Sequence, residues 1–208
     1  IQVTGNRIYN VKDIIDISQI EVGDNLVFIN DSKAVAAIYD KLPYIDQVKI
    51  VRKLPGTIVI EVSESYAIAA IKYDNRYWLI DKNGKALEEA TSSGIQNVIP
   101  VSGIEAQVSV QGDKLNVKEG DSAKFDYLVK VLTGLVDAGI QDRVLSIDVA
   151  NISNIRFDYG GRFTVELGSG ENIDYKLQLL ETVISKLNEN DKGVINLSVD
   201  KEAHFTPK

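Results

Sequence analysis

Two strands and the turn between them can be read from one segment of the chain, Arg52-Lys53-Leu54-Pro55-Gly56-Thr57-Ile58-Val59-Ile60-Glu61-Val62. On either side of Leu54-Pro55-Gly56, over residues 46–53 and 57–64, apolar side chains recur at every second position. This period is typical of strands that bury one face. Proline fixes its own φ and glycine accepts backbone angles that other residues avoid, so the three linking residues predict a hairpin turn.

Two short helices are predicted before this hairpin. Apolar residues three and four apart indicate one helix over residues 11–18 and another over 31–42. Asn30 suits the start of the second helix, because its side chain can accept a bond from a first-turn N–H, and Pro43 ends it because proline has no N–H. With a short strand over 1–3, the order is strand, helix, helix, strand, strand. This order predicts a three-stranded sheet covered on one face by two helices.

The remainder of the chain predicts a second, larger domain that is rich in strands. Its two helices are expected over 123–138 and 173–188, where apolar residues recur with the helical period. Strands are expected over 67–73, 76–80, 97–101, 144–149, 154–159, 162–167 and 194–199. The chain is therefore predicted to be an α+β protein with a β-α-α-β-β domain at 1–64, a mostly antiparallel β domain at 65–199 and a polar C-terminal tail at 200–208.

Composition excludes several classes of function. The 208 residues include no Cys, no Met and one His, and the formal net charge is -7. Without Cys there are no disulfides, thiol catalysis or Cys-ligated metals, and a single His leaves no second imidazole for zinc. The negative charge argues against nucleic acid as the main partner, because phosphate binding needs clustered Lys and Arg. Without Met the chain is expected to lack an upstream part, and no apolar run approaches the ~20 residues that cross a bilayer.

Motifs that carry chemistry are not found in the sequence. There is no phosphate-binding or dinucleotide-binding loop, and Gly168-Ser169-Gly170 lacks the full Gly-x-Ser-x-Gly pattern of a nucleophile elbow. His204 is interpreted as a surface residue of the polar tail. Trp78, with Tyr73 and Tyr77, either packs a hairpin onto a helix, the more frequent outcome, or forms an exposed aromatic patch. The sequence thus predicts a protein that is not an enzyme and holds no cofactor and no metal.

Several short segments resemble known domains in their order and spacing. Val3-Thr4-Gly5-Asn6, Gly23-Asp24-Asn25-Leu26, Leu42-Pro43-Tyr44-Ile45 and the segment from Arg52 to Val62 resemble a POTRA domain. Trp78-Leu79-Ile80-Asp81-Lys82-Asn83-Gly84 and the later layout of helix, strand, hairpin, helix and strand are similar to the second domain of the FtsQ/DivIB bacterial cell-division proteins. The chain departs from that family at Ser65-Tyr66-Ala67-Ile68-Ala69, where a Pro is usual.

The resemblance implies a non-catalytic scaffold of the bacterial divisome. It implies an extracytoplasmic region tethered to the cell membrane by a single N-terminal transmembrane helix that this sequence does not contain. The implied partners are the bitopic FtsL-type and FtsB/DivIC-type division proteins at the septum, and the isolated region is expected to be a monomer.

The same resemblance implies where the partner binds. In the family the main contact lies on the last strand of the β domain and the segment after it, which corresponds here to Leu197, Ser198, Val199, Lys201 and Phe205. Ser198-Val199 stand where family members often have Arg followed by Tyr, so backbone pairing is the expected mode of contact. Strand alternation alone leaves open whether Val199 faces a partner or the core.

Strand addition is the expected mode because unpaired N–H and C=O groups at a sheet edge can pair with an extended peptide. The strand predicted over 194–199 comes last in the chain, so it need not lie between later strands. An alternative partner for a POTRA fold is an unfolded substrate strand of a secretion or membrane-assembly system. A third interpretation, an envelope hydrolase, requires a converging acid and base that the sequence does not supply.

Overall fold

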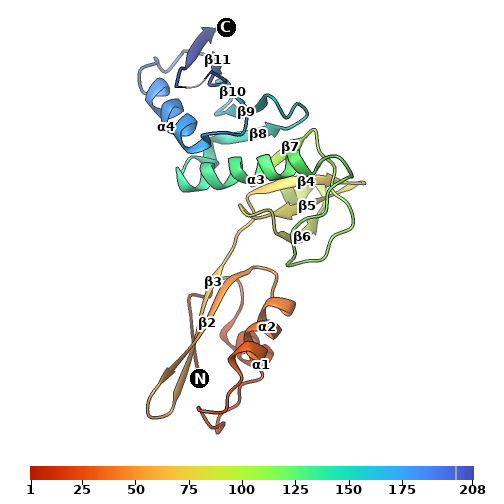
Figure 1. Ribbon diagram of the computed structural model, residues 1–208, viewed down its shortest axis with the longest axis vertical. Helices are drawn as coiled ribbons and strands as arrows, with labels where there is room; N and C mark the ends of the chain where they lie inside the picture. Colours follow the sequence, from red (N-terminus) through yellow and green to blue (C-terminus); the bar gives the residue numbers. More distant parts are fainter. Residues whose placement is uncertain (200) are drawn as a thin grey trace. The chain divides into compact units, whose positions relative to one another are not determined.

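The computed structural model describes residues 1–199 and 201–208, which form two compact units (Figure 1). One unit comprises Ile1–Tyr66 with Gln111–Asp113, and the other comprises Ala67–Val110 and Lys114–Lys208. Each unit has its own cluster of buried apolar residues. Asp200, the first residue of the predicted tail, lies outside the described residues.

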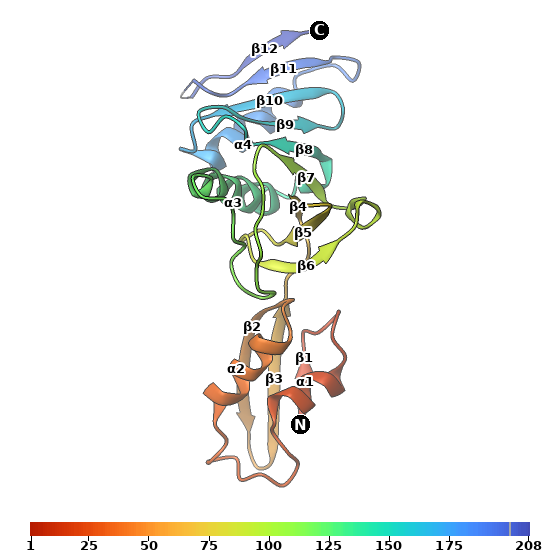
Figure 2. The ribbon, with the colours of Figure 1, turned by 90° about the vertical axis from the view of Figure 1, so that its right-hand side faces the viewer.

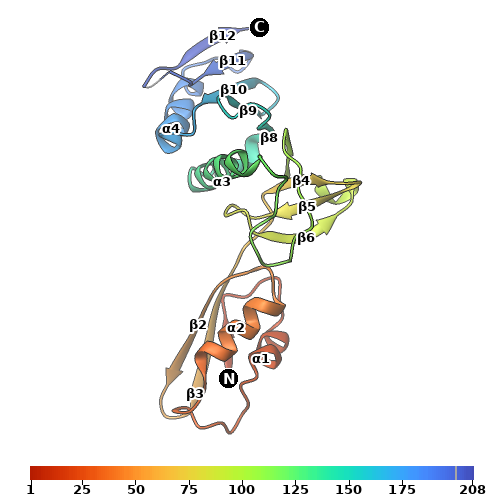
Figure 3. The same cartoon turned by 45° about the vertical axis from the view of Figure 1, so that its right-hand side comes forward.

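The first unit has the predicted order of elements. They are β1 (Gln2–Thr4), α1 (Val11–Ser18), α2 (Asp31–Lys41), β2 (Ile45–Lys53) and β3 (Thr57–Glu64). The strands lie in the order β1-β3-β2, with β1 parallel and β2 antiparallel to the central β3. Both helices cover one face of this sheet (Figure 3). The expected β-α-α-β-β fold is therefore confirmed.

Asparagine caps and buried isoleucines explain why these helices form and where they pack. The side-chain oxygens of Asn10 and Asn30 accept hydrogen bonds from the N–H groups of Asp13 and Lys33 at 2.9 and 3.0 Å, which confirms the predicted cap at Asn30. On the facing surfaces the core is built from apolar side chains of α1, α2 and β3, the largest of which are Ile14, Ile38 and Ile60.

The second unit is built on one nine-stranded sheet (Figure 2). Its strands are β4 (Ala69–Tyr73), β5 (Arg76–Ile80), β6 (Ala86–Ala90), β7 (Ile99–Ser102), β8 (Val144–Asp148), β9 (Ile155–Tyr159), β10 (Phe163–Gly168), β11 (Gly193–Asn196) and β12 (His204–Pro207). They lie in the order β12-β11-β10-β9-β8-β7-β4-β5-β6. The pairs β4–β7, β7–β8 and β10–β11 are parallel, and the other pairs are antiparallel. The sheet is thus mixed, with antiparallel pairs in the majority.

Two of the three parallel pairs are connected through helices, and both helices lie on one side of the sheet (Figures 1 and 2). They are α3 (Ser122–Asp137), which joins β7 to β8, and α4 (Ile173–Ile184), which joins β10 to β11. Short 3-10 turns lie at η1 (Ser92–Ile95) and η2 (Gln141–Arg143). The helices approach each other at Gly134, where a Cβ atom would stand 2.9 Å from Cδ1 of Leu177. Trp78 is buried in the core of this unit. Of the two alternatives predicted for it, packing inside the domain is therefore confirmed, and it does not form an exposed aromatic patch.

The sheet has two strands that were not predicted, and one helix is shorter than predicted. β6 lies after the β4–β5 hairpin, and β12 lies within the predicted polar tail. α4 ends at Ile184, not at residue 188. The strand predicted over 194–199 is β11, which begins one residue earlier and ends at Asn196.

Candidate partner-binding edge

The strand predicted over 194–199 was expected to offer an unpaired edge to a partner. The corresponding strand, β11, does not form the edge of the sheet, so that expectation is wrong. β11 lies between β10 and β12, parallel to the first and antiparallel to the second. On one flank, the N–H of Gly193 donates to the carbonyl of Arg162 at 3.1 Å and the N–H of Leu197 donates to that of Glu166 at 2.8 Å. The chain then reverses and adds β12 to the other flank. The edge is therefore the short strand β12.

The outward-facing groups of β12 follow from its register with β11. Thr206 lies opposite Val194, and a Cβ on Gly193 would stand 2.1 Å from the carbonyl oxygen of Thr206, which therefore points toward β11. The N–H of Lys208 also points toward β11, because it donates to the carbonyl of Lys192 at 2.9 Å. Since backbone groups alternate in direction along an antiparallel strand, the N–H and C=O of Phe205 point away from β11.

The neighbouring residue on the same flank is Pro207, which presents a carbonyl but no N–H. Proline at an outward-facing edge position limits indiscriminate pairing with other strands. Within the described part of the chain, β12 is hydrogen-bonded to β11 alone. On this flank, Phe205 is therefore the residue whose backbone offers both a hydrogen-bond donor (N–H) and an acceptor (C=O) to an added strand.

The predicted site residues lie in different environments. Leu197 is fully buried in the core, and its N–H is engaged by β10. Its side chain is not exposed, because it continues the inward-facing alternation of β11. Ser198, Val199 and Lys201 are exposed between β11 and β12. Val199 is 47% exposed, so it faces solvent and not the core.

Phe205 combines an outward-facing backbone with a half-buried side chain. Its ring packs on the core of the second unit and meets the ring of Phe163 edge-on, with the centroids 6.0 Å apart. Its neighbours His204 and Thr206 are exposed on the opposite face of the strand, and His204 contacts Glu202 at 3.2 Å. The edge thus presents one apolar face and one polar face.

Two buried polar side chains, which sequence reasoning did not identify, fix the end of β10 beside this edge. The hydroxyl of Tyr127 donates to the carbonyl of Gly168 at 2.9 Å, and Nζ of Lys176 donates to the carbonyl of Leu167 at 2.6 Å and to that of Ser169 at 2.9 Å. Burial raises the pKa of the Tyr127 hydroxyl. All three hydrogen bonds join residues that are at least 7 positions apart, so no local sequence pattern reveals them.

Gly168 allows the segment after β11 to pack closely on β10. Its φ is +69°, and a Cβ atom there would lie 2.6 Å from Cα of Ser198. Ser198 in turn donates from its N–H and its hydroxyl to Oδ1 of Asn196, at 2.8 and 2.7 Å. The segment that follows β11 therefore packs against the end of β10, which Tyr127 and Lys176 hold in place by hydrogen bonds.

The opposite edge of the sheet is less open. Lys85, next to the start of β6, forms a bridge with Lys114, and the N–H of Leu115 donates to the carbonyl of Gly84 at 2.9 Å. A loop thus covers the beginning of β6 from outside. Glu88 and Glu89 follow on this strand, and carboxylates on an edge strand disfavour pairing with other strands.

The described part of the chain contains no group of three or more His, Cys, Asp or Glu side chains placed to hold a metal ion. Among the helices of residues 1–199 and 201–208, none has the length and apolar character needed to span a membrane. The β12 edge is the feature that the geometry best equips for recognition.

Comparison with known proteins agrees with this architecture. Residues 1–65 match the family model described as "POTRA domain, FtsQ-type", and residues 69–200 match "Cell division protein FtsQ/DivIB, C-terminal". The "Cell division protein DivIB" of Clostridium botulinum (strain Hall) is 29% identical over 209 residues, which cover 99% of this chain and 79% of that protein.

More distant relatives carry both family names. The "Cell division protein FtsQ" of Streptomyces collinus is 25% identical and covers 88% of this chain and 69% of its own. The "Cell division protein DivIB" of Bacillus subtilis is 24% identical and covers 96% and 70%. The solved major extracytoplasmic domain of DivIB from Geobacillus stearothermophilus, in its trans isomer, aligns with a TM-score of 0.38 at 13% identity, over 62% of this chain and 98% of that one. With two family models in succession, the chain belongs to the FtsQ/DivIB family of non-catalytic cell-division proteins.

Proposed function

We propose that this chain is the extracytoplasmic part of a membrane-anchored division protein and that it acts as a scaffold at the septum. Its partners are the FtsL-type and FtsB/DivIC-type bitopic proteins, and capture occurs through a strand that the partner adds to β12. Family membership supports the division role. The observation that carries the binding mode is the free flank of β12, where the N–H and C=O of Phe205 point outward.

The faces of β12 define the partner sequence that fits. Side chains directly opposite each other on paired strands share one face of the sheet. A partner residue opposite Phe205 lies beside an aromatic ring and should be apolar, whereas its neighbours lie opposite His204 and Thr206 and should be polar. A short strand with one apolar residue between two polar ones therefore fits this edge.

A peptide from the juxtamembrane region of an FtsB/DivIC-type partner tests the proposal. We expect it to bind the chain with micromolar or better affinity in titration calorimetry. Deletion of residues 204–208 should abolish binding while the cooperative melting transition remains. Binding that survives this deletion would contradict the assignment to β12. It would favour either the free flank of β2, where a substrate strand of the kind bound by other POTRA domains could pair, or the flank of β11 that the deletion uncovers.

A matched set of variants separates backbone pairing from side-chain contact. Phe205→Ala removes the ring and keeps the outward N–H, whereas Phe205→Pro removes both. We expect the Pro variant to bind the peptide at least about tenfold more weakly than the Ala variant, since one backbone bond at a recognition edge is lost. Thr206→Ala serves as the control, because this side chain lies on the polar face and the backbone groups of Thr206 point toward β11. Equal affinities for the Ala and Pro variants would argue against strand addition at this position.

A further inference from the structure

The first unit carries an apolar surface that neither its core nor the β12 edge explains. Among the described residues, the most exposed large apolar side chains are Val22, Val27, Phe28 and Leu54, each between 80% and 91% exposed. Val22, Val27 and Phe28 lie in the loop between α1 and α2, and Leu54 lies in the turn between β2 and β3. These two segments lie at the same end of the unit (Figures 2 and 3). Large apolar side chains exposed in neighbouring segments of a domain indicate a contact surface.

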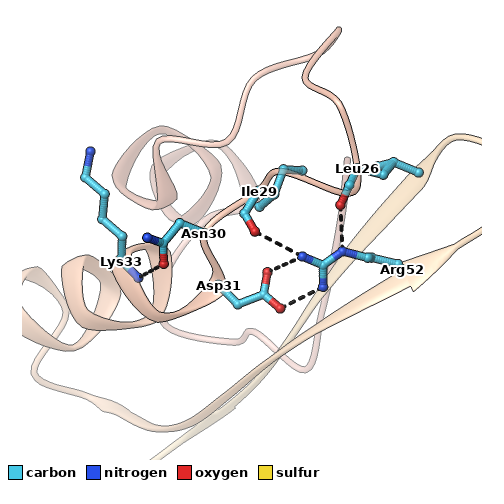
Figure 4. A network of polar contacts seen from close by, with 6 residues as sticks. All are labelled: Leu26, Ile29, Asn30, Asp31, Lys33 and Arg52. Atoms are coloured by element: carbon cyan, nitrogen blue, oxygen red, sulfur yellow. Dashed lines mark hydrogen bonds and ion pairs between the residues drawn. The ribbon is translucent and has the colours of Figure 1, made fainter.

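Arg52 fixes the loop in this exposed position (Figure 4). Its guanidinium donates to the carbonyl of Leu26 at 2.7 Å and to that of Ile29 at 3.1 Å, and it donates to both carboxylate oxygens of Asp31 at 2.7 Å. Leu26 and Ile29 flank Val27 and Phe28. The loop is therefore held at both ends while its two central side chains project into solvent.

Part of the loop backbone is also paired within the protein. The N–H of Val27 donates to Oδ1 of Asn25 at 2.9 Å, and the N–H of Phe28 donates to the carbonyl of Asn25 at 2.9 Å. The N–H groups of Val27 and Phe28 and the carbonyls of Leu26 and Ile29 are thus paired within the protein. Because an unpaired backbone group is costly to place in an apolar environment, these bonds lower the cost of bringing the loop to the headgroup boundary of a bilayer.

The chain begins at the same end of the unit. β1 is parallel to β3 with Gln2 opposite Val59, so Ile1 lies beside the start of β3, where the β2–β3 turn is found (Figure 2). If a membrane anchor precedes Ile1, as in the proposed function on which this step rests, the chain leaves the bilayer at this end. The exposed apolar side chains then face the lipid surface.

We propose that this end of the first unit contacts an anionic phospholipid bilayer, with Val27, Phe28 and Leu54 inserted at the boundary between headgroups and acyl chains. Lys33 and Lys53 are exposed nearby and can reach lipid phosphates while their stems stay with the apolar side chains. Val22 lies next to Glu21 and close to Asp24 in the sequence. Because these carboxylates are repelled by anionic lipid, Val22 stays at the rim of the contact. Asp31 adds little repulsion, because Arg52 pairs with it.

The absence of cysteine from the sequence permits a direct test with single-site probes. The chain is tethered through an N-terminal histidine tag to vesicles of phosphatidylcholine and phosphatidylglycerol that contain nickel-chelating lipid and brominated acyl chains. A fluorophore is attached to Leu54→Cys or, as a control, to Asp40→Cys at the other end of α2. We expect bromine quenching at position 54 and none at position 40. Equal, weak quenching at both positions would overturn the proposal.

Further variants separate contact with lipid from contact with a second protein. Val27→Ser with Phe28→Ser should reduce quenching at position 54 to the level at position 40 without changing the melting temperature, because both side chains are exposed. Quenching that appears only when a second membrane protein is reconstituted would assign the surface to a protein partner and would overturn the lipid assignment.

This test is independent of the β12 edge. Peptide binding to β12 is measured without lipid, so its failure leaves the vesicle result unaffected. The anchor itself is tested separately, by finding whether the full-length gene product fractionates with membranes. Loss of quenching with retained peptide binding would therefore reject the lipid contact alone.

Discussion

Phe205 on β12 meets Phe163 on β10 edge-on across the intervening strand β11, with the ring planes at 80°. The contact is made possible by Gly193 on β11, since a Cβ there would lie 3.0 Å from Cε2 of Phe205 and 2.1 Å from the carbonyl oxygen of Thr206. Because Gly193 has no side chain, the ring of Phe205 can reach Phe163, and this contact attaches β12 to the core.

Gly193→Ala should displace β12 from the sheet. The added methyl group overlaps both the backbone and the ring of the edge strand, and overpacking of this kind costs about 1–3 kcal/mol. We expect faster hydrogen exchange at residues 204–208 and loss of peptide binding. Gly56→Ala is the matched control, because a Cβ at Gly56 meets no atom within 4 Å. Unchanged exchange in the Gly193 variant would show that β12 is not held in this way.

Phe205→Ala should weaken partner capture and lower the free energy of unfolding moderately. The ring is half-buried, so we expect a loss of about 1–3 kcal/mol, below the about 3–5 kcal/mol typical of fully buried aromatics. Urea denaturation and peptide titration measure the two effects. A loss of cooperative unfolding would identify the residue as essential to the core and not only to the edge.

Val199→Asp should weaken capture while stability stays within about 0.5 kcal/mol of the parent, as for other exposed positions. Its exposure between β11 and β12 places a new charge next to the proposed edge. The contrasting variant is Leu197→Asp, which buries a carboxylate and should unfold the domain. Peptide affinity unaffected by Val199→Asp would remove Val199 from the site.

Tyr127 should make stability depend on pH in alkaline solution. Because burial raises its pKa in the folded state, the unfolded chain loses this proton first, near pH 10. Folding stability is therefore fully present below about pH 10 and falls above it, by at most about 1.4 kcal/mol per pH unit.

Tyr127→Phe should flatten this alkaline decline relative to the parent. At neutral pH the same variant loses the bond to Gly168, at a cost of about 1 kcal/mol. Thermal melts between pH 7 and pH 11 compare the two chains. Parallel pH profiles would show that Tyr127 does not cause the decline.

Arg52→Lys should loosen the loop between α1 and α2 without unfolding the first unit. A lysine ammonium cannot reproduce the two-pronged contact with Asp31 together with the bonds to Leu26 and Ile29. We expect faster limited proteolysis within residues 22–29 and little change in melting temperature. Arg76→Lys is the control, since Arg76 makes one exposed ion pair with Glu89 at 2.9 Å. Equal cleavage rates would show that the loop does not depend on Arg52.

The local elements of the first unit could be predicted because their signals are local. The asparagine cap at Asn30, the turn at Pro55-Gly56 and the alternation through Ile58 and Ile60 each act within a few residues. The structure places the corresponding elements within one or two residues of the prediction. The family resemblance, which the comparisons confirm, added the domain type.

The order of strands could not be predicted because it depends on distant pairing. β6 contains Ala, Leu and Glu, which favour helices in isolation, and becomes a strand because β5 pairs with it. β12 contains one large apolar residue, Phe205, and a proline, so its pattern is that of a polar tail. β12 is a strand because it pairs with β11. The edge of the sheet therefore lies at residues 204–207 and not at 194–199, where it was expected.

Because β12 follows every other described element in the chain, the proposed docking edge is completed only after the ribosome has passed residue 207. A polypeptide truncated before His204 keeps the elements from β4 to β11 but loses the Phe205 ring that packs on their core, and it presents β11 as its outermost strand. Under the proposed function, competence for docking therefore depends on translation of the last strand as well as on formation of the core.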